Sequence, residues 1–268
     1  MIELGHFLPG AQLLTVEKGV SETYVGMIEV GERHLNAYVK IQSERELANE
    51  LLGSVLARKA GLSTPAAFLV QVRREDYPAS SRFQLPGLDA ICAFATEALS
   101  FTSFNRTAAL QSPDARKTFI GAWPDWPAVL GFDDWIANGD RHGGNFLIGG
   151  PGIVWLIDHG HAFTGPSWQI ASLQPQCAVN YRLWNEVIQP NITPEARHAA
   201  VPRAVKAAMT FQDIDPDSAI EVAMIRPNLT TEEIQALSDF IRVRSGGVGQ
   251  RICALLGHPQ LPLQDAKP

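Results

Sequence analysis

The sequence contains little cysteine and no closely spaced cysteine pair. Its three cysteines, Cys92, Cys177 and Cys253, lie far apart and form no Cys-x-x-Cys motif. This pattern offers neither a structural zinc site nor a disulfide framework, because both need several cysteines at suitable spacing. Unpaired cysteines fit a reducing compartment, so the sequence predicts a cytoplasmic protein.

Long apolar runs and an excess of basic residues are also missing. No apolar stretch approaches the roughly 20 residues of a membrane-spanning helix, and residues 1–10 lack the basic start and apolar run of a signal peptide. The formal net charge is −6, whereas nucleic-acid-binding proteins normally carry a basic surface. We therefore expect a soluble protein with no membrane span and no nucleic-acid partner.

The first hundred residues contain several strand-like segments and one helix. Runs rich in β-branched and aromatic residues, separated by glycine-containing turns, predict strands. These runs lie at 13–16, 23–30, 35–41, 66–72 and 90–95. A helix is predicted between Ser43 and Gly61, because Ser43 and Glu46 form a capping box, leucines recur at helical spacing, and Gly61 suits a helix end.

After residue 100 the pattern becomes helical. The segment 126–138 has a proline in its expected first turn, which is typical of a helix start. Further helix start signals lie at Thr193, Asp215 and Thr230. The sequence therefore predicts an α+β fold with two lobes.

The predicted boundary between the lobes lies at residue 98. Residues 1–98 would form a small lobe of antiparallel sheet with one helix, and residues 99–268 a larger, mainly helical lobe.

Residues 138–161, NGDRHGGNFLIGGPGIVWLIDHGH, carry polar side chains at both ends of an apolar strand pair. The two strands are joined by Gly-Gly-Pro-Gly at 149–152, a strong turn signal. If these four residues form the loop, Asn145 faces Leu156, and Asp158 lies on the same face of the hairpin as Leu156. Asn145 and Asp158 then become diagonal neighbours, whose oxygens could bind one magnesium ion.

Asp140 precedes Asn145 by five residues, on the loop that enters the first strand. The spacing Asp-x-x-x-x-Asn is that of a kinase catalytic loop, where the Asp accepts the proton of the substrate hydroxyl and the Asn holds magnesium. Asp158 would then be the second metal ligand. The pattern predicts a bilobal, protein-kinase-like fold that uses ATP and Mg²⁺.

A lysine for the ATP phosphates is expected upstream. Lys40 ends a predicted strand directly before the helix, which is where kinases place this lysine. Glu50, one turn into the helix, is its expected ion-pair partner, because Glu46 is engaged by the capping box.

The turn at 17–23 contains no Gly-x-Gly-x-x-Gly motif. Ser21 and Thr23 are its candidate phosphate contacts, although a plain hairpin turn would have the same composition. Glu97 and Ala98, at the end of the last predicted strand, are placed beside adenine by analogy alone.

The stretch FDDWIANGDRHGGNFLI followed by WLIDHGHAF resembles the HipA-like kinases, whose signature is Asn-x-Asp-Arg-His-x-x-Asn and then Ile-Asp-His/Phe-Gly. The Lys40 strand, the Asn49-Glu50-Leu51 helix and the segment AGLSTP are similar to the small lobe of the family. The resemblance implies the following roles: Asp140 as catalytic aspartate, Asn145 and Asp158 as magnesium ligands, Lys40 on the ATP phosphates, Glu50 as its partner, and His142 as an orienting group behind the catalytic loop.

The same resemblance implies transfer of the γ-phosphoryl group of ATP to a hydroxyl, with serine or threonine of a protein as the acceptor. It also suggests an antitoxin-like regulator as a partner. Acidic net charge makes an anionic lipid surface a poorer match than a protein substrate.

Two alternatives compete with a kinase. Asp158, His159 and His161, together with Asp140 and His142, could form the metal centre of a hydrolase. On a continuing strand, however, both histidines of the 158–161 segment would point away from the Asp158 face. The second alternative is a nucleotide-binding pseudokinase, a scaffold that binds partners without turnover.

Overall fold

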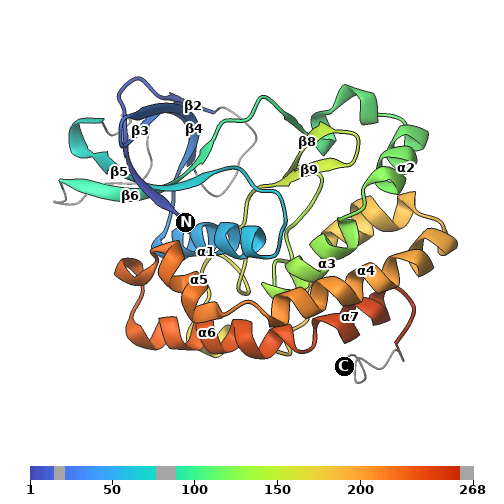
Figure 1. Ribbon diagram of the computed structural model, residues 1–268. Helices are drawn as coiled ribbons and strands as arrows, with labels where there is room; N and C mark the ends of the chain where they lie inside the picture. The colour runs from blue at the N-terminus through green and yellow to red at the C-terminus, as the bar shows by residue number, and fades with distance from the viewer. Residues whose placement is uncertain (15–21, 77–88, 260–268) are drawn as a thin grey trace.

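The computed structural model describes residues 1–14, 22–76 and 89–259. Ser21 and the last two residues of the strand expected at 13–16 lie outside these ranges. Figure 1 shows a strand-rich part built from the first hundred residues beside a group of helices formed by the chain after residue 112. The predicted mixture of sheet and helix is confirmed.

The strand-rich part is a barrel. Its strands are β1 (Glu3–Phe7), β2 (Gln12–Leu13), β3 (Glu22–Val30), β4 (Arg33–Ile41), β5 (Ala67–Arg73) and β6 (Ala90–Glu97). They pair in the order β1-β5-β6-β4-β3-β2, and an additional pairing of β1 with β3 closes the sheet on itself. Buried side chains such as Phe7, Tyr24, Ile28 and Phe68 fill the interior.

The sheet is antiparallel as predicted except at one pairing, because β1 runs parallel to β5 where the barrel closes. The strand β1 was not predicted, since its sequence ELGHF buries only Gly5 and Phe7 and gives too short an apolar pattern. A Cβ atom on Gly5 would lie 2.7 Å from the carbonyl oxygen of Glu29. Glycine at this position therefore permits the close approach of β1 to β3.

Helix α1 (Glu44–Lys59) follows β4 after two intervening residues. The capping box is confirmed, with Ser43 Oγ accepting from Glu46 N and Glu46 Oε2 accepting from Ser43 N. Gly61 has φ = +76°, and the amide of Leu62 donates to the carbonyl of Ala57, which is the pattern of a Schellman helix end. The apolar side chains of α1 belong to the core of the helical part rather than to the barrel interior.

The helical part contains a second, small sheet. Its strands β7 (Thr102–Ser103), β8 (Phe146–Gly150) and β9 (Ile153–Leu156) pair antiparallel in that order. The helices are α2 (Pro113–Ala122), α3 (Trp126–Trp135), α4 (Pro194–Gln212), α5 (Pro216–Ala223), α6 (Thr231–Ser245) and α7 (Val248–Leu255). The predicted starts at Thr193, Asp215 and Thr230 are confirmed, because each side chain caps its helix.

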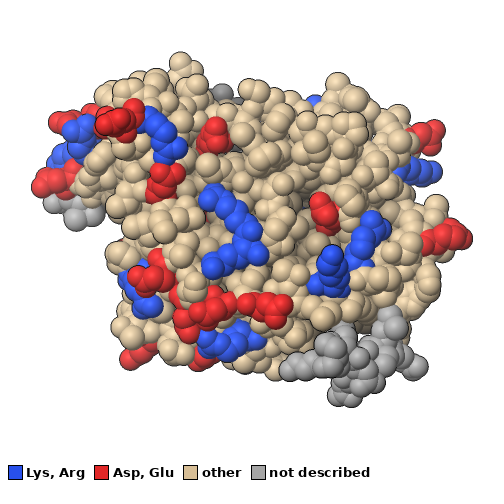
Figure 2. All heavy atoms as spheres, in the orientation of Figure 1, with Lys and Arg blue, Asp and Glu red and all other residues tan. Residues whose placement is uncertain are grey.

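The surface carries charges of both signs. On the face shown in Figure 2, blue and red side chains alternate over α5 and α6, where Arg226 pairs with Glu221 and Arg242 pairs with Asp217. This face therefore has no continuous basic patch. Within the ranges that the structure describes, every helix is too short or too polar to cross a membrane.

Asp134, near the end of α3, is the centre of a buried charge cluster. It accepts hydrogen bonds from Arg244 of α6 (3.2 Å), Arg251 of α7 (2.9 Å) and the hydroxyl of Tyr181 (2.7 Å). Arg244 and Asp134 are both fully buried. Arg244 also donates to the carbonyl of Cys177 (3.0 Å), so the cluster ties three helices to the irregular segment around residue 180.

We expect Arg244→Ala to lower the free energy of unfolding by about 3–5 kcal/mol, because it removes the fully buried one of the two guanidinium groups that pair with the buried Asp134 carboxylate. Arg242→Ala on the same helix is the matched control. Arg242 forms an exposed ion pair with Asp217, so its loss should cost only about 0–1 kcal/mol. Urea denaturation followed by circular dichroism measures both changes, and equal effects would contradict this account of the cluster.

Candidate active site

Arg141 holds the loop at 138–145 from behind. Its Nε donates to both carboxylate oxygens of Asp133 (3.0 and 3.1 Å), and its Nη1 donates to the carbonyls of Asn145 (3.1 Å) and Ile157 (2.5 Å). Its Nη2 contacts Nδ1 of His159 at 3.0 Å. Arg141 is 1% exposed. One buried guanidinium therefore joins α3, the loop and the segment after β9.

Burial raises the pKa of Asp133 to about 6, with Arg141 opposing the rise and Asp134 adding to it. At neutral pH the Asp133 carboxylate is ionised and forms a buried pair with the Arg141 guanidinium. The loop is thus anchored by a charge-assisted bond, which is stronger than a neutral one.

The register of the hairpin differs from the prediction. Phe146, not Asn145, lies opposite Leu156, because a bulge between Ile148 and Gly150 shifts the pairing by one residue. The strand also ends before Asp158, which has φ = +63°. Extrapolating the strand to Asp158 was therefore wrong, and the predicted common face of the hairpin does not exist.

Asn145 and Asp158 nevertheless come from adjoining backbone. The amide of Ile157 donates to the carbonyl of Asn145 at 3.1 Å. Asn145 is therefore bonded to the residue that directly precedes Asp158. Asn145 is 5% exposed, and its Nδ2 donates to the carbonyl of Asp140 at 3.2 Å. With Nδ2 engaged, Oδ1 is the side-chain atom that a hard cation would use.

Lys40 of β4 lies between two carboxylates. Its Nζ is 2.5 Å from Glu50 Oε1 and 2.9 Å from Asp158 Oδ1. Glu50 is fully buried, and its second oxygen accepts from the amide of His159 at 2.7 Å. The structure therefore brings together three predicted residues from β4, α1 and the turn after β9.

The pKa values in this cluster follow from burial and pairing. Burial lowers the pKa of Lys40, but Asp158 and Glu50 outweigh it and raise the pKa overall. Burial raises the pKa of Asp158, but Lys40 outweighs it and lowers the pKa overall. Burial raises the pKa of Glu50 despite Lys40. Both oxygens of Glu50 accept hydrogen bonds from N–H donors, however, and one of these donors is the Lys40 ammonium, which favours the ionised carboxylate.

Asn49, beside Glu50, holds the chain that follows Asp158. Its Nδ2 donates to the carbonyls of Gly160 (2.7 Å), Ala162 (3.0 Å) and Gly165 (3.1 Å), and its Oδ1 accepts from Nε1 of Trp168 (2.8 Å). Asn49 is fully buried. No local sequence pattern predicts this role of Asn49, because its partners lie more than 100 residues away.

The five residues proposed for a hydrolase do not converge. Nδ1 of His159 accepts a hydrogen bond from Arg141, which has no acceptor, so His159 is neutral with its proton on Nε2. Burial and Arg141 both lower the pKa of His159, which agrees with a neutral ring. Within the described ranges, no group of three or more His, Cys, Asp or Glu side chains could hold a metal ion.

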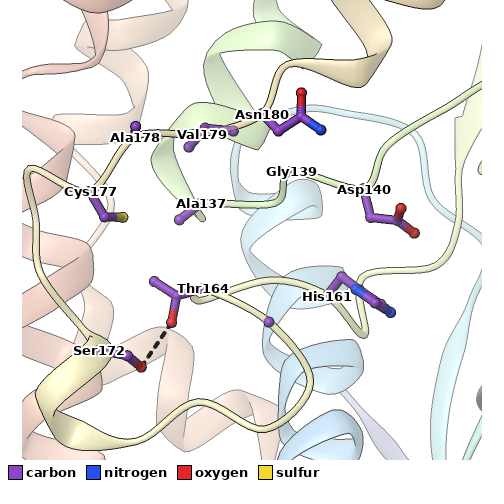
Figure 3. A pocket seen from close by; sticks show the side chains of 11 residues that line it. Ala137, Gly139, Asp140, His161, Thr164, Ser172, Cys177, Ala178, Val179 and Asn180 are labelled. Carbon is purple, nitrogen blue, oxygen red and sulfur yellow. Dashed lines mark hydrogen bonds between the residues drawn. The ribbon is translucent and has the colours of Figure 1, made fainter.

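Asp140 has a partner that the sequence analysis missed. Nη1 of Arg182 lies 2.5 Å from Asp140 Oδ1, and the other edge of the guanidinium contacts Glu186. Beside Asp140 is a cavity of about 310 Å³, lined also by His161 and Asn180 (Figure 3). Arg182 was missed because its segment carries no regular secondary-structure signal.

The remaining predicted residues are more peripheral. His142 is partly buried and accepts from the amide of Gly144 through Nδ1 (2.9 Å), so it braces the loop internally, whereas Arg141 lies behind the loop. Thr23 pairs with Lys40 across β3 and β4. The amides of Glu97 and Ala98 already donate to backbone carbonyls of Ala66 and Asn36, so only their carbonyls could meet adenine.

Gly53 of α1 lies against His159. A Cβ atom at Gly53 would be 2.5 Å from the Cβ of His159, which has little freedom to move. We expect Gly53→Ala to lower the free energy of unfolding by about 1–3 kcal/mol through overpacking, although alanine is the better helix former. Gly121→Ala in α2 is the control, because a Cβ there meets nothing within 4 Å; it should be neutral or stabilising by up to about 1 kcal/mol. Denaturant unfolding of both variants tests the contact, and a stable Gly53→Ala protein would refute it.

Comparisons with known proteins agree with this geometry. A sequence model described as "HipA-like kinase" matches residues 13–213. A search of curated proteins gave no match. Among solved structures, the proinflammatory kinase CtkA of Helicobacter pylori is similar, with 10% sequence identity, a TM-score of 0.56, and coverage of 92% of this chain and 98% of CtkA.

At 10% identity the likeness to CtkA shows a shared fold, while the family match covers most of the chain and includes both Lys40 and Asp158. The chain therefore belongs to the HipA-like kinases, a family of phosphotransferases.

Proposed function

We propose that the protein transfers the γ-phosphoryl group of ATP to a hydroxyl, using Mg²⁺. The observation that carries the proposal is the position of Lys40 Nζ, which contacts both Glu50 and Asp158. A kinase needs this lysine and its helix carboxylate next to the metal-binding aspartate. The two lobes expected at 1–98 and 99–268 would then hold the nucleotide between them.

The residues present fit a magnesium ion. Asp158 offers an ionised carboxylate and Asn145 an amide oxygen, and Mg²⁺ prefers such ligands while keeping positions for water and phosphate. When bound, the ion would neutralise charge on the transferred phosphoryl group. Lys40 would bind the phosphates, and Glu50 would keep its ammonium in place.

Asp140 would orient the acceptor hydroxyl and accept its proton. The loop around it is held by the Arg141–Asp133 pair and by Asn145, so the carboxylate is positioned before the acceptor arrives. Thr23 would contact phosphate, as would Ser21, which lies outside the described residues. The carbonyls of Glu97 and Ala98 would face adenine.

We propose a serine or threonine of a protein as the acceptor, with an antitoxin-like regulator as a further partner and the cytoplasm as the location. A net charge of −6 supports a protein acceptor over an anionic lipid surface. A nucleotide-binding pseudokinase would still use Lys40 and Asp158, but it would have no need for Asp140.

Asp140→Ala should lower turnover by roughly 10²–10⁴-fold, the usual contribution of a general base, and leave the affinity for Mg–ATP unchanged. Label transfer from γ-labelled ATP to casein or to the chain itself measures turnover, and titration calorimetry measures binding. Wild-type turnover in this variant would exclude Asp140 from the reaction. Absence of transfer by the wild-type protein would favour the scaffold.

Asp158→Ala should abolish the magnesium-dependent part of ATP binding, because Asn145 alone is a weak ligand for Mg²⁺. The measurement is the shift in unfolding temperature with ATP, with and without Mg²⁺. Elemental analysis of the purified protein distinguishes the kinase from the hydrolase alternative, because the hydrolase requires a bound transition metal. Unchanged Mg–ATP binding in the variant would remove Asp158 from the metal site.

A further inference from the structure

Arg182 reaches Asp140 from 42 residues further along the chain. One guanidinium nitrogen, Nη1, donates to Asp140 Oδ1 at 2.5 Å, while Nε donates to Glu186 Oε1 at 2.8 Å. The side chains of Arg182 and Asp140 are each 33% exposed. The guanidinium is thus held on two sides by carboxylates, rather than extending freely into solvent.

The segment that carries Arg182 is fixed to the helices beneath it. Tyr181, its chain neighbour, donates to buried Asp134 at 2.7 Å. Arg244 donates to the carbonyls of Pro175 (2.7 Å) and Cys177 (3.0 Å) in the same segment. Because these partners are buried in the core of the helical part, Arg182 is presented to Asp140 by a rigid support.

Only one oxygen of Asp140 is taken by Arg182. The second oxygen, Oδ2, remains available for the hydroxyl of an acceptor that enters the adjoining cavity, which His161 also lines (Figure 3). Arginine keeps its charge at any physiological pH. A fixed positive charge beside the acceptor can also offset negative charge on the transferred phosphoryl group.

We propose that Arg182 is a positioning residue for phosphoryl transfer: it fixes the Asp140 carboxylate through Oδ1 so that Oδ2 points to the acceptor hydroxyl. The proposal rests on the function proposed above and assigns a role to a residue outside the kinase motifs. No covalent change occurs at Arg182. Its contribution is the orientation of Asp140, so its effect should vanish when Asp140 is absent.

The experiment is a double-mutant cycle on the full chain with Mg–ATP and casein. Arg182→Ala should lower kcat roughly 10- to 100-fold, the usual cost of misplacing a catalytic group, with unchanged affinity for Mg–ATP. Arg182→Lys should retain more activity than Arg182→Ala, and added guanidinium ion should restore part of the loss in Arg182→Ala. In an Asp140→Ala background, Arg182→Ala should cause no further loss. Arg226→Ala, which removes an exposed arginine of the Glu221 pair, should have the wild-type kcat.

Three results would overturn the proposal: an unchanged kcat in Arg182→Ala, an increased kcat, which would make Arg182 a block on Asp140, or losses that multiply in the double variant. Arg182→Gln, which keeps most of the side chain, repeats the cycle if the alanine variant has a lowered unfolding temperature. An active wild-type protein with active Arg182 variants would reject this role alone. A wild-type protein that transfers no phosphate would reject both the role and the proposed function.

Discussion

The mostly buried ammonium group of Lys40 lies between carboxylates from two distant parts of the chain, the buried Glu50 and the partly exposed Asp158. A buried lysine would lose its charge without such partners, and unpaired buried carboxylates would be as costly. Lys40 therefore stabilises both carboxylates, which repel each other, and both stabilise its charge, so the three elements that carry them must pack in one arrangement. The cluster carries one excess negative charge, which suits a site that receives a divalent cation together with a polyphosphate.

Helix α1 is the common support of this arrangement. Two residues separate it from the strand that carries Lys40, and it presents Asn49, Glu50 and Gly53 to the turn after Asp158. Its apolar side chains pack into the core of the helical part. A displacement of α1 would at once separate Glu50 from Lys40 and release the chain held by Asn49. The helix thus couples the barrel to the turn that carries Asp158.

The sequence allowed prediction of features that depend on local chemistry. The Ser43 cap, the Gly61 helix end and the choice of Glu50 as the neighbour of Lys40 depend on spacing within one helix. The hairpin register was wrong because Gly150 pairs with Ile153 and a bulge precedes it, which apolar alternation cannot reveal. The closure of the barrel by β1 and the approach of Arg182 to Asp140 depend on contacts between distant segments, and no local pattern encodes them.

Two adjacent carboxylates at the end of α3 divide the support of the site between them. Asp133 binds Arg141, which holds the loop of Asp140, while Asp134 binds Tyr181 and Arg244, which hold the segment of Arg182. Carboxylates near the carboxyl end of a helix are disfavoured by the helix dipole, and burial adds to this cost. Arginines paired with Asp133 and Asp134 offset this cost. The loop of Asp140 and the segment of Arg182 are therefore both anchored through charge pairs on one turn of α3. The separation between Asp140 and Arg182 is therefore set by α3, not by either loop alone.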